Sequence, residues 1–248
     1  MTRVKICGVM NPQDIAVCIQ AGADMIGFVV DYPVVVPWNL SVSAAKELIR
    51  QVPPFVSSCM VTGGSVSKVL ELAYETQPHT VQLHYRETLR EVQEISGRLQ
   101  EQGIKTLKAL RISAEGVCDF EISDPAAAAR ELSQTGVAAL VVDAHTTAMP
   151  GGTGVRVDAA IFQAVKQASL VPVVLAGGLT PENVRSVIEQ TNPYAIDVLT
   201  GVEARTGYKD REKVRRLIKS VKQAAYAEME PSGVRGHAHP VSYRAGTR

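Results

Sequence analysis

Five side chains able to do acid–base chemistry or to bind a ligand stand at or near the ends of short apolar runs. They are Cys7, His84, Arg111, Asp143 and Asp197. A thiolate can act as a general base, and a carboxylic acid at the end of an apolar strand can act as a general acid. If the runs are parallel strands whose carboxyl ends meet at one rim, the five side chains share one site. We therefore predict a proton-transfer site at that rim.

Glycines follow the last three apolar runs, where a loop backbone can approach a phosphate closely. Gly152 and Gly154 stand in the segment GGTG, Gly177 and Gly178 follow the run VPVVLA, and Gly201 follows the final run. Bare main-chain N–H groups beside a helix N-terminus can hold a phosphate without any lysine. We predict a phosphate site here, with a plain tight turn as the alternative for the glycine pair.

The residues after Gly178 favour a helix that begins at once. Thr180 suits the N-cap, Pro181 suits the first helical position, and Glu182 stands where the helix dipole favours negative charge. We expect this helix N-terminus to lie beside the glycine pair.

Cys7 ends the strand pattern Val4-Lys5-Ile6-Cys7, in which side chains alternate between two faces. Lys5 and Cys7 therefore share one face, opposite Val4 and Ile6. If that face lines a barrel, the Lys5 cation and nearby helix N-termini lower the pKa of the Cys7 thiol. The alternative is a buried structural thiol.

The other four residues also have structural alternatives. Asp143 is either a general acid or a cap of the loop that follows it. Asp197 either orients a substrate hydroxyl or binds a neighbouring backbone group. His84, which shares its strand face with Gln82, is a ligand contact or a hydrogen-bonded core histidine, and Arg111 is a ligand contact or a salt-bridge partner.

The remaining cysteines give no sign of a metal site or a disulfide framework. Cys18, Cys59 and Cys118 are scattered, form no CxxC pair and have no histidine at zinc-ligand spacing. We expect Cys18 and Cys59 to be inert core residues.

Short apolar runs alternate with helical patterns along most of the chain. The apolar runs are Val4–Cys7, Met25–Val30, Phe55–Val61, Thr80–His84, Ile104–Ile112, Ala138–Asp143, Val171–Ala176 and Tyr194–Leu199. The helical patterns are Pro12–Ala21, Val42–Gln51, Ser65–Thr76, Thr88–Gln102, Asp124–Gln134, Asp158–Ala168, Pro181–Glu189 and Asp210–Ala227. Repeated strand–helix units imply a parallel sheet, and eight of them fit a closed (β/α)8 TIM barrel better than an open sheet.

We therefore predict an α/β single-domain barrel over residues 1–227 and a polar, disordered extension over residues 228–248. The alternative for the extension is a basic flap that folds over a phosphorylated ligand or a neighbouring subunit. The irregular segment Cys118–Asp124 leaves room for an additional element.

Composition excludes several classes of partner. A formal net charge of +1 argues against nucleic acid or an acidic membrane surface. No apolar run reaches the ~20 residues that span a bilayer, and the start, MTRVKICG, lacks the apolar region of a signal peptide. We expect no nucleic-acid or membrane partner and a cytoplasmic location.

A base on the first strand, an acid on the sixth and phosphate loops after the last strands suggest one reaction. They suit proton abstraction beside a carbonyl or imine of a sugar phosphate. That chemistry requires neither a cofactor nor a metal.

Several segments resemble the phosphoribosylanthranilate isomerase family of tryptophan biosynthesis. They are KICG at 5–8, AGAD at 21–24, VQLH at 81–84, GGTG at 151–154, AGGL at 176–179, PENV at 181–184, DV at 197–198 and GVE at 201–203. The resemblance implies a (β/α)8 barrel that converts an aminoaldose phosphate to an aminodeoxyketose phosphate by an Amadori rearrangement. It implies Cys7 as the base that takes the sugar C2 proton and Asp143 as the acid that opens the ribose ring. It also implies that the loops at Gly177-Gly178 and Gly201 hold the phosphate.

The sequence departs from that family after the second apolar run. The family has a Ser-Pro-Arg-like segment whose arginine faces the anthranilate carboxylate, whereas this chain reads DYPVVVPWNLS at 31–41. A carboxylate without that cation loses a charge-assisted pair of roughly 1.5–3 kcal/mol. Tyr85 also replaces a glycine of the family, and Leu199-Thr200 replaces a serine pair. The catalytic and phosphate parts are kept while the end that receives the aglycone differs.

Three functions follow. The first is an isomerase acting on phosphoribosylanthranilate or a close analogue. The second is a paralogous isomerase for a different phosphorylated amino sugar or aromatic. The third is a non-catalytic barrel that binds a phosphorylated ligand, which the retention of Cys7 and Asp143 disfavours. The sequence leaves the aglycone open, and the chain is expected to be a monomer or a homodimer.

Overall fold

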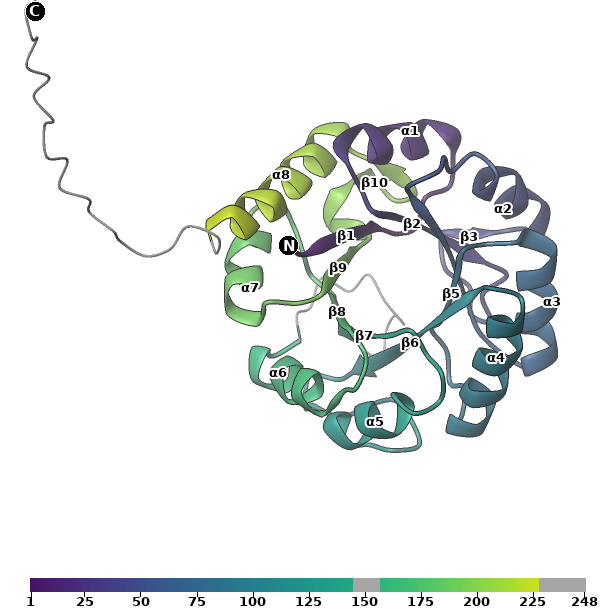
Figure 1. Ribbon diagram of the computed structural model, residues 1–248. Coiled ribbons are helices and arrows are strands. Elements are labelled where there is room, and N and C mark those ends of the chain that lie inside the picture. Colours follow the sequence, from purple (N-terminus) through teal and green to yellow (C-terminus); the bar gives the residue numbers. More distant parts are fainter. Residues whose placement is uncertain (145–156, 228–248) are drawn as a thin grey trace, which may run out of the picture.

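Eight parallel strands curve into a closed barrel in the computed structural model, which describes residues 1–144 and 157–227 (Figure 1). The barrel strands are β1 (Arg3–Ile6), β2 (Met25–Val30), β4 (Ser57–Thr62), β5 (Thr80–Leu83), β6 (Lys105–Ile112), β7 (Ala139–Ala144), β8 (Val173–Ala176) and β9 (Ala195–Val198). Each pairs in parallel with its neighbour, and β1 pairs with both β2 and β9. The first and last strands therefore close the barrel, as predicted.

Helices form a ring outside the strands (Figure 1). They are α1 (Pro12–Ala21), α2 (Val42–Ile49), α3 (Val66–Thr76), α4 (Leu89–Glu101), α5 (Pro125–Leu132), α6 (Ala159–Ala168), α7 (Val184–Thr191) and α8 (Arg211–Ala227). Side-chain oxygens cap seven of them by accepting a main-chain N–H of the first turn, with Asp210 serving α8. The other six caps are Asn11, Ser41, Ser65, Thr88, Asp124 and Asp158. These short polar residues explain why the helix starts could be placed from sequence.

The predicted start of α7 is wrong by three residues. Thr180 is not the N-cap, because a turn covers residues 181–183 and the helix begins at Val184. The cause is Asn183, whose side chain bonds within the preceding loop: Oδ1 accepts from the Thr180 N–H and Nδ2 donates to the Gly178 carbonyl. These bonds close the loop after β8 before the helix begins.

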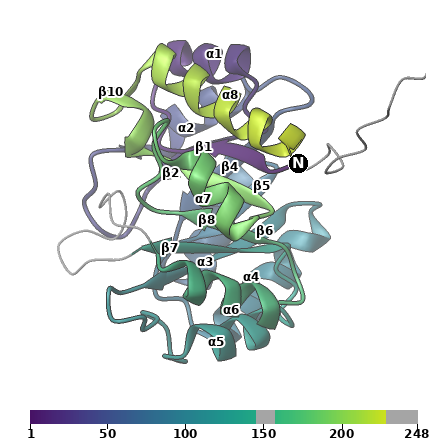
Figure 2. The same ribbon diagram turned by 90° about the vertical axis from the view of Figure 1, so that its left-hand side faces the viewer.

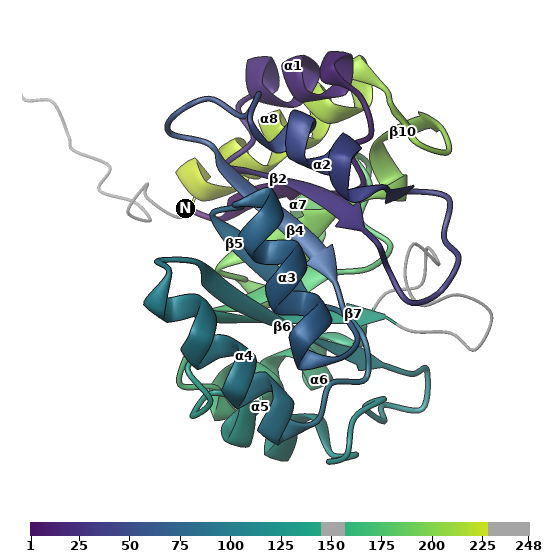
Figure 3. The same ribbon diagram turned by 90° about the vertical axis from the view of Figure 1, so that its right-hand side faces the viewer.

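Smaller elements extend the rim. The strand β3 (Asn39–Leu40) adds to the edge of β2, and a short helix η1 (Thr200–Val202) leads into the hairpin β10 (Glu203–Arg205) and β11 (Tyr208–Lys209). The hairpin lies at the end of the barrel opposite the N-terminus, which is the end where the strands finish (Figures 2 and 3). The segment 118–124 holds no helix or ladder strand, only an isolated bridge between Ile112 and Cys118.

The core has two layers that follow strand parity. Val4 and Ile6 of β1 belong to the large apolar layer between strands and helices, whereas Cys7 belongs to a second cluster inside the barrel. Lys5 is buried on the same face as Cys7. The predicted orientation of the first strand is thereby confirmed.

Within residues 1–144 and 157–227, no helix is long and apolar enough to cross a membrane. The extension predicted at residues 228–248 lies outside the described residues.

Candidate active site

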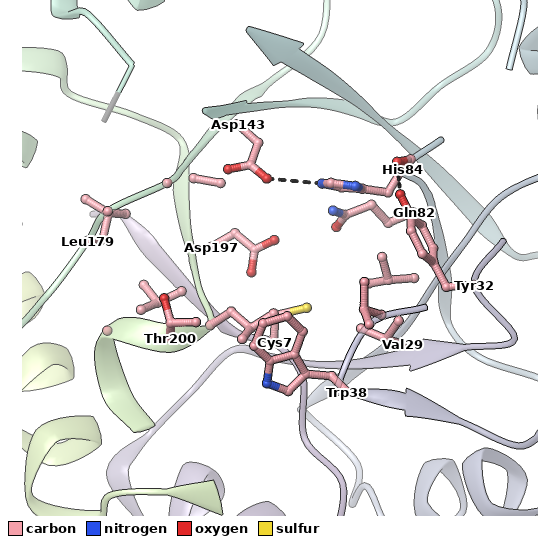
Figure 4. Close-up of a pocket in the computed structure, with 18 residues that line it drawn as sticks. Cys7, Val29, Tyr32, Trp38, Gln82, His84, Asp143, Leu179, Asp197 and Thr200 are labelled. Atoms are coloured by element: carbon pink, nitrogen blue, oxygen red, sulfur yellow. Dashed lines mark hydrogen bonds and ion pairs between the residues drawn. The ribbon is translucent and has the colours of Figure 1, made fainter. Parts of the chain in front are cut away.

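A cavity opens at the carboxyl end of the barrel strands. Its empty volume is about 730 Å³, its open mouth included. Five polar side chains that line it come from three strands, β5, β7 and β9, and from the residues directly after β1 and β5: Cys7, Gln82, His84, Asp143 and Asp197. Figure 4 shows Cys7 and Asp143 on opposite sides of the cavity, with Asp197 between them. Four of the five side chains predicted to share a site line this cavity: Cys7, His84, Asp143 and Asp197.

The Cys7 thiol is held at the floor of this cavity by local packing. The main-chain N–H of Cys7 donates to the Val198 carbonyl at 2.8 Å, and this bond joins the end of β1 to β9. A Cβ at Gly27 of β2 would lie 2.7 Å from the Cys7 Sγ, so only glycine leaves room for the sulfur. Sequence reasoning missed this role of Gly27, because the contact between the two strands is visible only in the barrel.

Charge around the thiol acts in two directions. Burial raises the pKa of Cys7, whereas the Lys5 ammonium lowers it and the Asp197 carboxylate raises it again. Burial alone would lower the pKa of Lys5, but Asp197 and Cys7 outweigh that effect and raise the pKa above its usual value. The expected lowering of the Cys7 pKa is therefore not what the structure gives: desolvation is the larger effect, and the lysine offsets part of it.

Asp143 faces the thiol from β7 and is bonded to a histidine. Its Oδ2 lies 3.1 Å from His84 Nε2, and both side chains are about one-tenth exposed. The His84 carbonyl accepts a hydrogen bond from the Tyr32 hydroxyl at 2.7 Å. The carboxyl group is thus held in one direction and can exchange a proton with the imidazole or with a ligand.

Two buried acceptor atoms in the cavity lining have no hydrogen-bond partner among the described residues. They are Gln82 Oε1 and Asp197 Oδ1. The other oxygen of Asp197 accepts from Lys5 Nζ at 2.6 Å. Such atoms are costly to leave unpaired, so they suit a ligand that carries hydroxyl donors.

The loops after β8 and β9 form the rim beside Asp197. Gly177 and Gly178 adopt positive φ angles of 90° and 60°, and hydrogen bonds among the described residues leave their N–H groups without acceptors. A Cβ at Gly201 would clash with the Leu179 carbonyl oxygen, so this glycine lets the two loops touch. Gly177, Gly178 and Gly201 all line the cavity.

One predicted ligand residue lies away from the cavity, and two others lie outside the described residues. The Arg111 guanidinium points to Asp119, with which it forms a partly buried ion pair, and Arg111 is absent from the cavity lining. This is the salt-bridge alternative considered for it. Gly152 and Gly154 lie outside the described residues.

An apolar wall completes the cavity on the side of β2 and β4. We call Val29, Tyr32, Val36, Trp38 and Val61 the aromatic wall. The Trp38 indole N–H donates to Glu203 Oε1 at 2.8 Å, and Lys209 Nζ lies 3.1 Å from the same oxygen. The signal in the sequence was the single tryptophan of an apolar segment, but its partner is 165 residues away.

Metal binding has no support in the part of the chain that the structure describes. There, no three or more His, Cys, Asp and Glu side chains are grouped to hold an ion, and all four cysteines are free and buried.

The family model for N-(5'-phosphoribosyl)anthranilate (PRA) isomerase matches residues 4–220, which span every strand of the barrel and both rim loops. The chain belongs to the PRA isomerase family. The match also covers Cys7, Asp143 and the glycines of the rim, so the resemblance found in the sequence is confirmed.

Curated members of the family cover nearly the same length. The N-(5'-phosphoribosyl)anthranilate isomerase of Haloferax volcanii is 36% identical over 225 residues, 90% of this chain and 95% of that protein. That of Methanosarcina acetivorans is 34% identical over 223 residues, 89% and 93% of the two chains.

Solved structures of PRA isomerases share the fold. The enzyme of Thermotoga maritima is 31% identical with a TM-score of 0.72, covering 90% of this chain and all of that one. A PRA isomerase in complex with reduced 1-(o-carboxyphenylamino)-1-deoxyribulose 5-phosphate is 30% identical with a TM-score of 0.69 and the same coverage.

Proposed function

We propose that this chain is an isomerase that converts an N-(5'-phosphoribosyl) arylamine, phosphoribosylanthranilate or a relative of it, to the 1-deoxyribulose 5-phosphate product. The observation that carries the proposal is the placement of Cys7 and Asp143 on opposite sides of one cavity, with Asp197 between them (Figure 4). Family membership supports the same reaction.

The reaction needs one acid and one base on the two faces of the sugar. Asp143 donates a proton to the ring oxygen, the C1–O bond breaks, and the nitrogen lone pair forms the C1=N bond of a Schiff base. The Cys7 thiolate then removes the C2 proton, and the C2–H electrons form a C1=C2 double bond and neutralise the nitrogen. Transfer of the C2 hydroxyl proton and protonation of C1 give the ketone. C1 is reduced and C2 is oxidised within the same molecule, so no external oxidant is required.

Other residues of the cavity bind and orient the substrate in this proposal. The N–H groups of Gly177 and Gly178, with the loop at Gly201, suit the phosphate, because main-chain donors can hold an anion without a cation. Asp197 Oδ1 and Gln82 Oε1 accept from the sugar hydroxyls. His84 keeps the Asp143 carboxyl in place through their hydrogen bond.

The test is turnover of synthetic phosphoribosylanthranilate, followed by fluorescence and by release of tritium from C2. We expect turnover by the wild-type chain and a loss of about 10²–10⁴-fold in Cys7→Ala and in Asp143→Asn. Cys18→Ala is the matched control, since Cys18 is a buried core thiol of α1 and does not line the cavity. Phosphate binding with no tritium release from any arylamine substrate would instead establish the non-catalytic barrel.

The oligomeric state is proposed only as monomer or homodimer. One similar structure is described as monomers derived from the dimeric Thermotoga maritima enzyme, at 29% identity and a TM-score of 0.71. Light scattering of the full chain distinguishes the two states.

A further inference from the structure

A single buried carboxylate oxygen, Oε1 of Glu203, accepts hydrogen bonds from three donors behind the cavity. They are the Trp38 indole N–H at 2.8 Å, the Gly207 main-chain N–H at 3.1 Å and Lys209 Nζ at 3.1 Å. The side chain of Glu203 is 6% exposed and that of Lys209 is fully buried. Neither side chain lines the cavity, and the proposed mechanism uses neither. Because burial of such a pair costs desolvation energy, the pair by itself is weak evidence of a stabilising role.

The bonds of this pair reach two different parts of the cavity lining. Trp38 belongs to the aromatic wall, and its ring nitrogen points away from the cavity (Figure 4). Lys209 Nζ also donates to the Leu199 carbonyl at 3.2 Å. Leu199 directly precedes Thr200 and Gly201, and all three line the cavity. The pair thus bonds the aromatic wall on one side and the loop after β9 on the other.

The two bonded parts also meet beside the proposed base. A Cβ at Gly8, which has a φ of 67°, would lie 3.0 Å from Leu199 Cγ and 3.2 Å from Trp38 Cδ1. Both side chains therefore pack against the main chain directly after Cys7. A buried indole N–H that loses its acceptor is costly, so without Glu203 the ring would turn to find another partner.

We infer that Glu203, together with Lys209, is a positioning residue that fixes the Trp38 ring and the loop 199–201 around the substrate. The inference rests on the proposed isomerase function and adds to it a residue that acts only through its neighbours. Among the described residues, no hydrogen bond joins the pair to Cys7 or Asp143. The pair therefore governs substrate binding more than the proton transfers.

Three substitutions separate the bonds of the carboxylate. Glu203→Gln keeps an oxygen that can accept from the indole but leaves Lys209 without its counter-charge, whereas Glu203→Ala removes both partners. Trp38→Phe keeps an aromatic ring and removes only the indole N–H. We expect Glu203→Ala to raise KM for phosphoribosylanthranilate by about tenfold, as the loss of a charge-assisted bond would, and to change kcat less.

Binding of inorganic phosphate, measured by calorimetry, distinguishes the two ends of the site. Glu203→Ala should raise its dissociation constant by about threefold or more, because the loop after β9 loses the bond through Lys209. Trp38→Phe should leave that constant unchanged, since it alters only the aromatic wall. Denaturant melts show which variants fold.

Trp38 is the only tryptophan of the chain, so its fluorescence reports the position of this one ring without any turnover. In Glu203→Ala we expect the emission maximum to move to longer wavelength and quenching by acrylamide to increase. Glu203→Gln should keep the wild-type emission. The matched control is Glu87→Gln, which breaks an equally buried pair with Lys108 away from this ring. It should cost stability and leave the emission unchanged.

Two results overturn the inference and spare the isomerase function. One is an unchanged emission and KM in Glu203→Ala. The other is an equal emission shift in Glu87→Gln, because the shift would then follow from lost stability and not from the contact. If Glu203→Ala does not fold, Glu203→Gln decides: weaker phosphate binding with unchanged emission supports the inference, and unchanged phosphate binding overturns it. Absence of turnover by the wild-type chain overturns the proposed function, whereas emission and phosphate binding still test the position of Trp38.

Discussion

Lys5 Nζ lies 2.6 Å from Asp197 Oδ2, and the two residues are register partners on the strands that close the barrel. Both side chains are buried, and the lysine also lowers the pKa of the Cys7 thiol two residues further along β1. One ion pair therefore joins the closure of the fold to the electrostatics of the proposed base.

Replacing Lys5 tests both roles, because each has its own measurement. Lys5→Met leaves a buried carboxylate without its cation, and we expect a loss of about 3–5 kcal/mol in the free energy of unfolding. The same change removes the main influence that lowers the Cys7 pKa, so the rise of kcat/KM with pH should shift to higher pH. Denaturant melts and pH–rate profiles measure the two effects. Arg215→Met, which breaks an exposed pair with Glu212, is the control and should change neither.

The wild-type pH profile tests the thiol as the base. Burial raises the pKa of Cys7 above its ordinary value of 9.0, and only the thiolate can take the C2 proton. Below that pKa, each pH unit changes the thiolate fraction about tenfold. We expect kcat/KM to increase steadily between about pH 7 and pH 9 without a plateau. A plateau reached below about pH 8 would contradict this assignment.

Stability at alkaline pH depends on a thiol outside the cavity. Burial raises the pKa of Cys18 from 9.0 to about 12, so the folded chain holds this proton more tightly than the unfolded chain. The resulting stabilisation is complete below about pH 9 and is lost as the pH rises towards 12. By pH ~10.5 the loss from this group is about 2 kcal/mol. Cys18→Ala should flatten the profile of unfolding free energy by that amount, and an unchanged profile would argue against the shift.

Gly201 allows a test of the phosphate loops. In Gly201→Ala the new Cβ would clash with the Leu179 carbonyl, so the loops after β8 and β9 must separate. We expect KM and the inhibition constant of inorganic phosphate to rise by about tenfold or more, with a smaller change in kcat. Gly97→Ala in α4 is the matched control, because nothing lies within 4 Å of its new Cβ. That variant should keep its KM and gain about 0.5–1 kcal/mol in stability.

Much of the fold could be predicted because its signals are local. Buried parallel strands appear as continuous apolar runs, and caps such as Asn11 and Thr88 mark where helices begin. The start of α7 was misplaced because Asn183 uses its side chain inside the preceding loop. The choice between Thr180 and Asn183 depends on how that loop folds, which the local sequence does not determine.

The candidate site could be predicted in part for a different reason. Parity and the common edge of parallel strands placed Cys7, His84, Asp143 and Asp197 around one cavity. Arg111 also lies near the carboxyl end of a strand, but its side chain is long and points away from the cavity. It forms an ion pair with Asp119 in the loop that follows. The contact of Trp38 with Glu203 was beyond prediction, because it joins distant segments through a hairpin that has no strong sequence signal.

Closure of the barrel by β1 and β9 has a consequence for synthesis on the ribosome. β1 is translated before β9, and Asp197, the ion-pair partner of Lys5, follows Lys5 by 192 residues. A nascent chain that stops before Ala195 lacks the edge to which β1 pairs, so its catalytic centre is still incomplete. The proposed site is therefore complete only after β9 (Ala195–Val198) has been made.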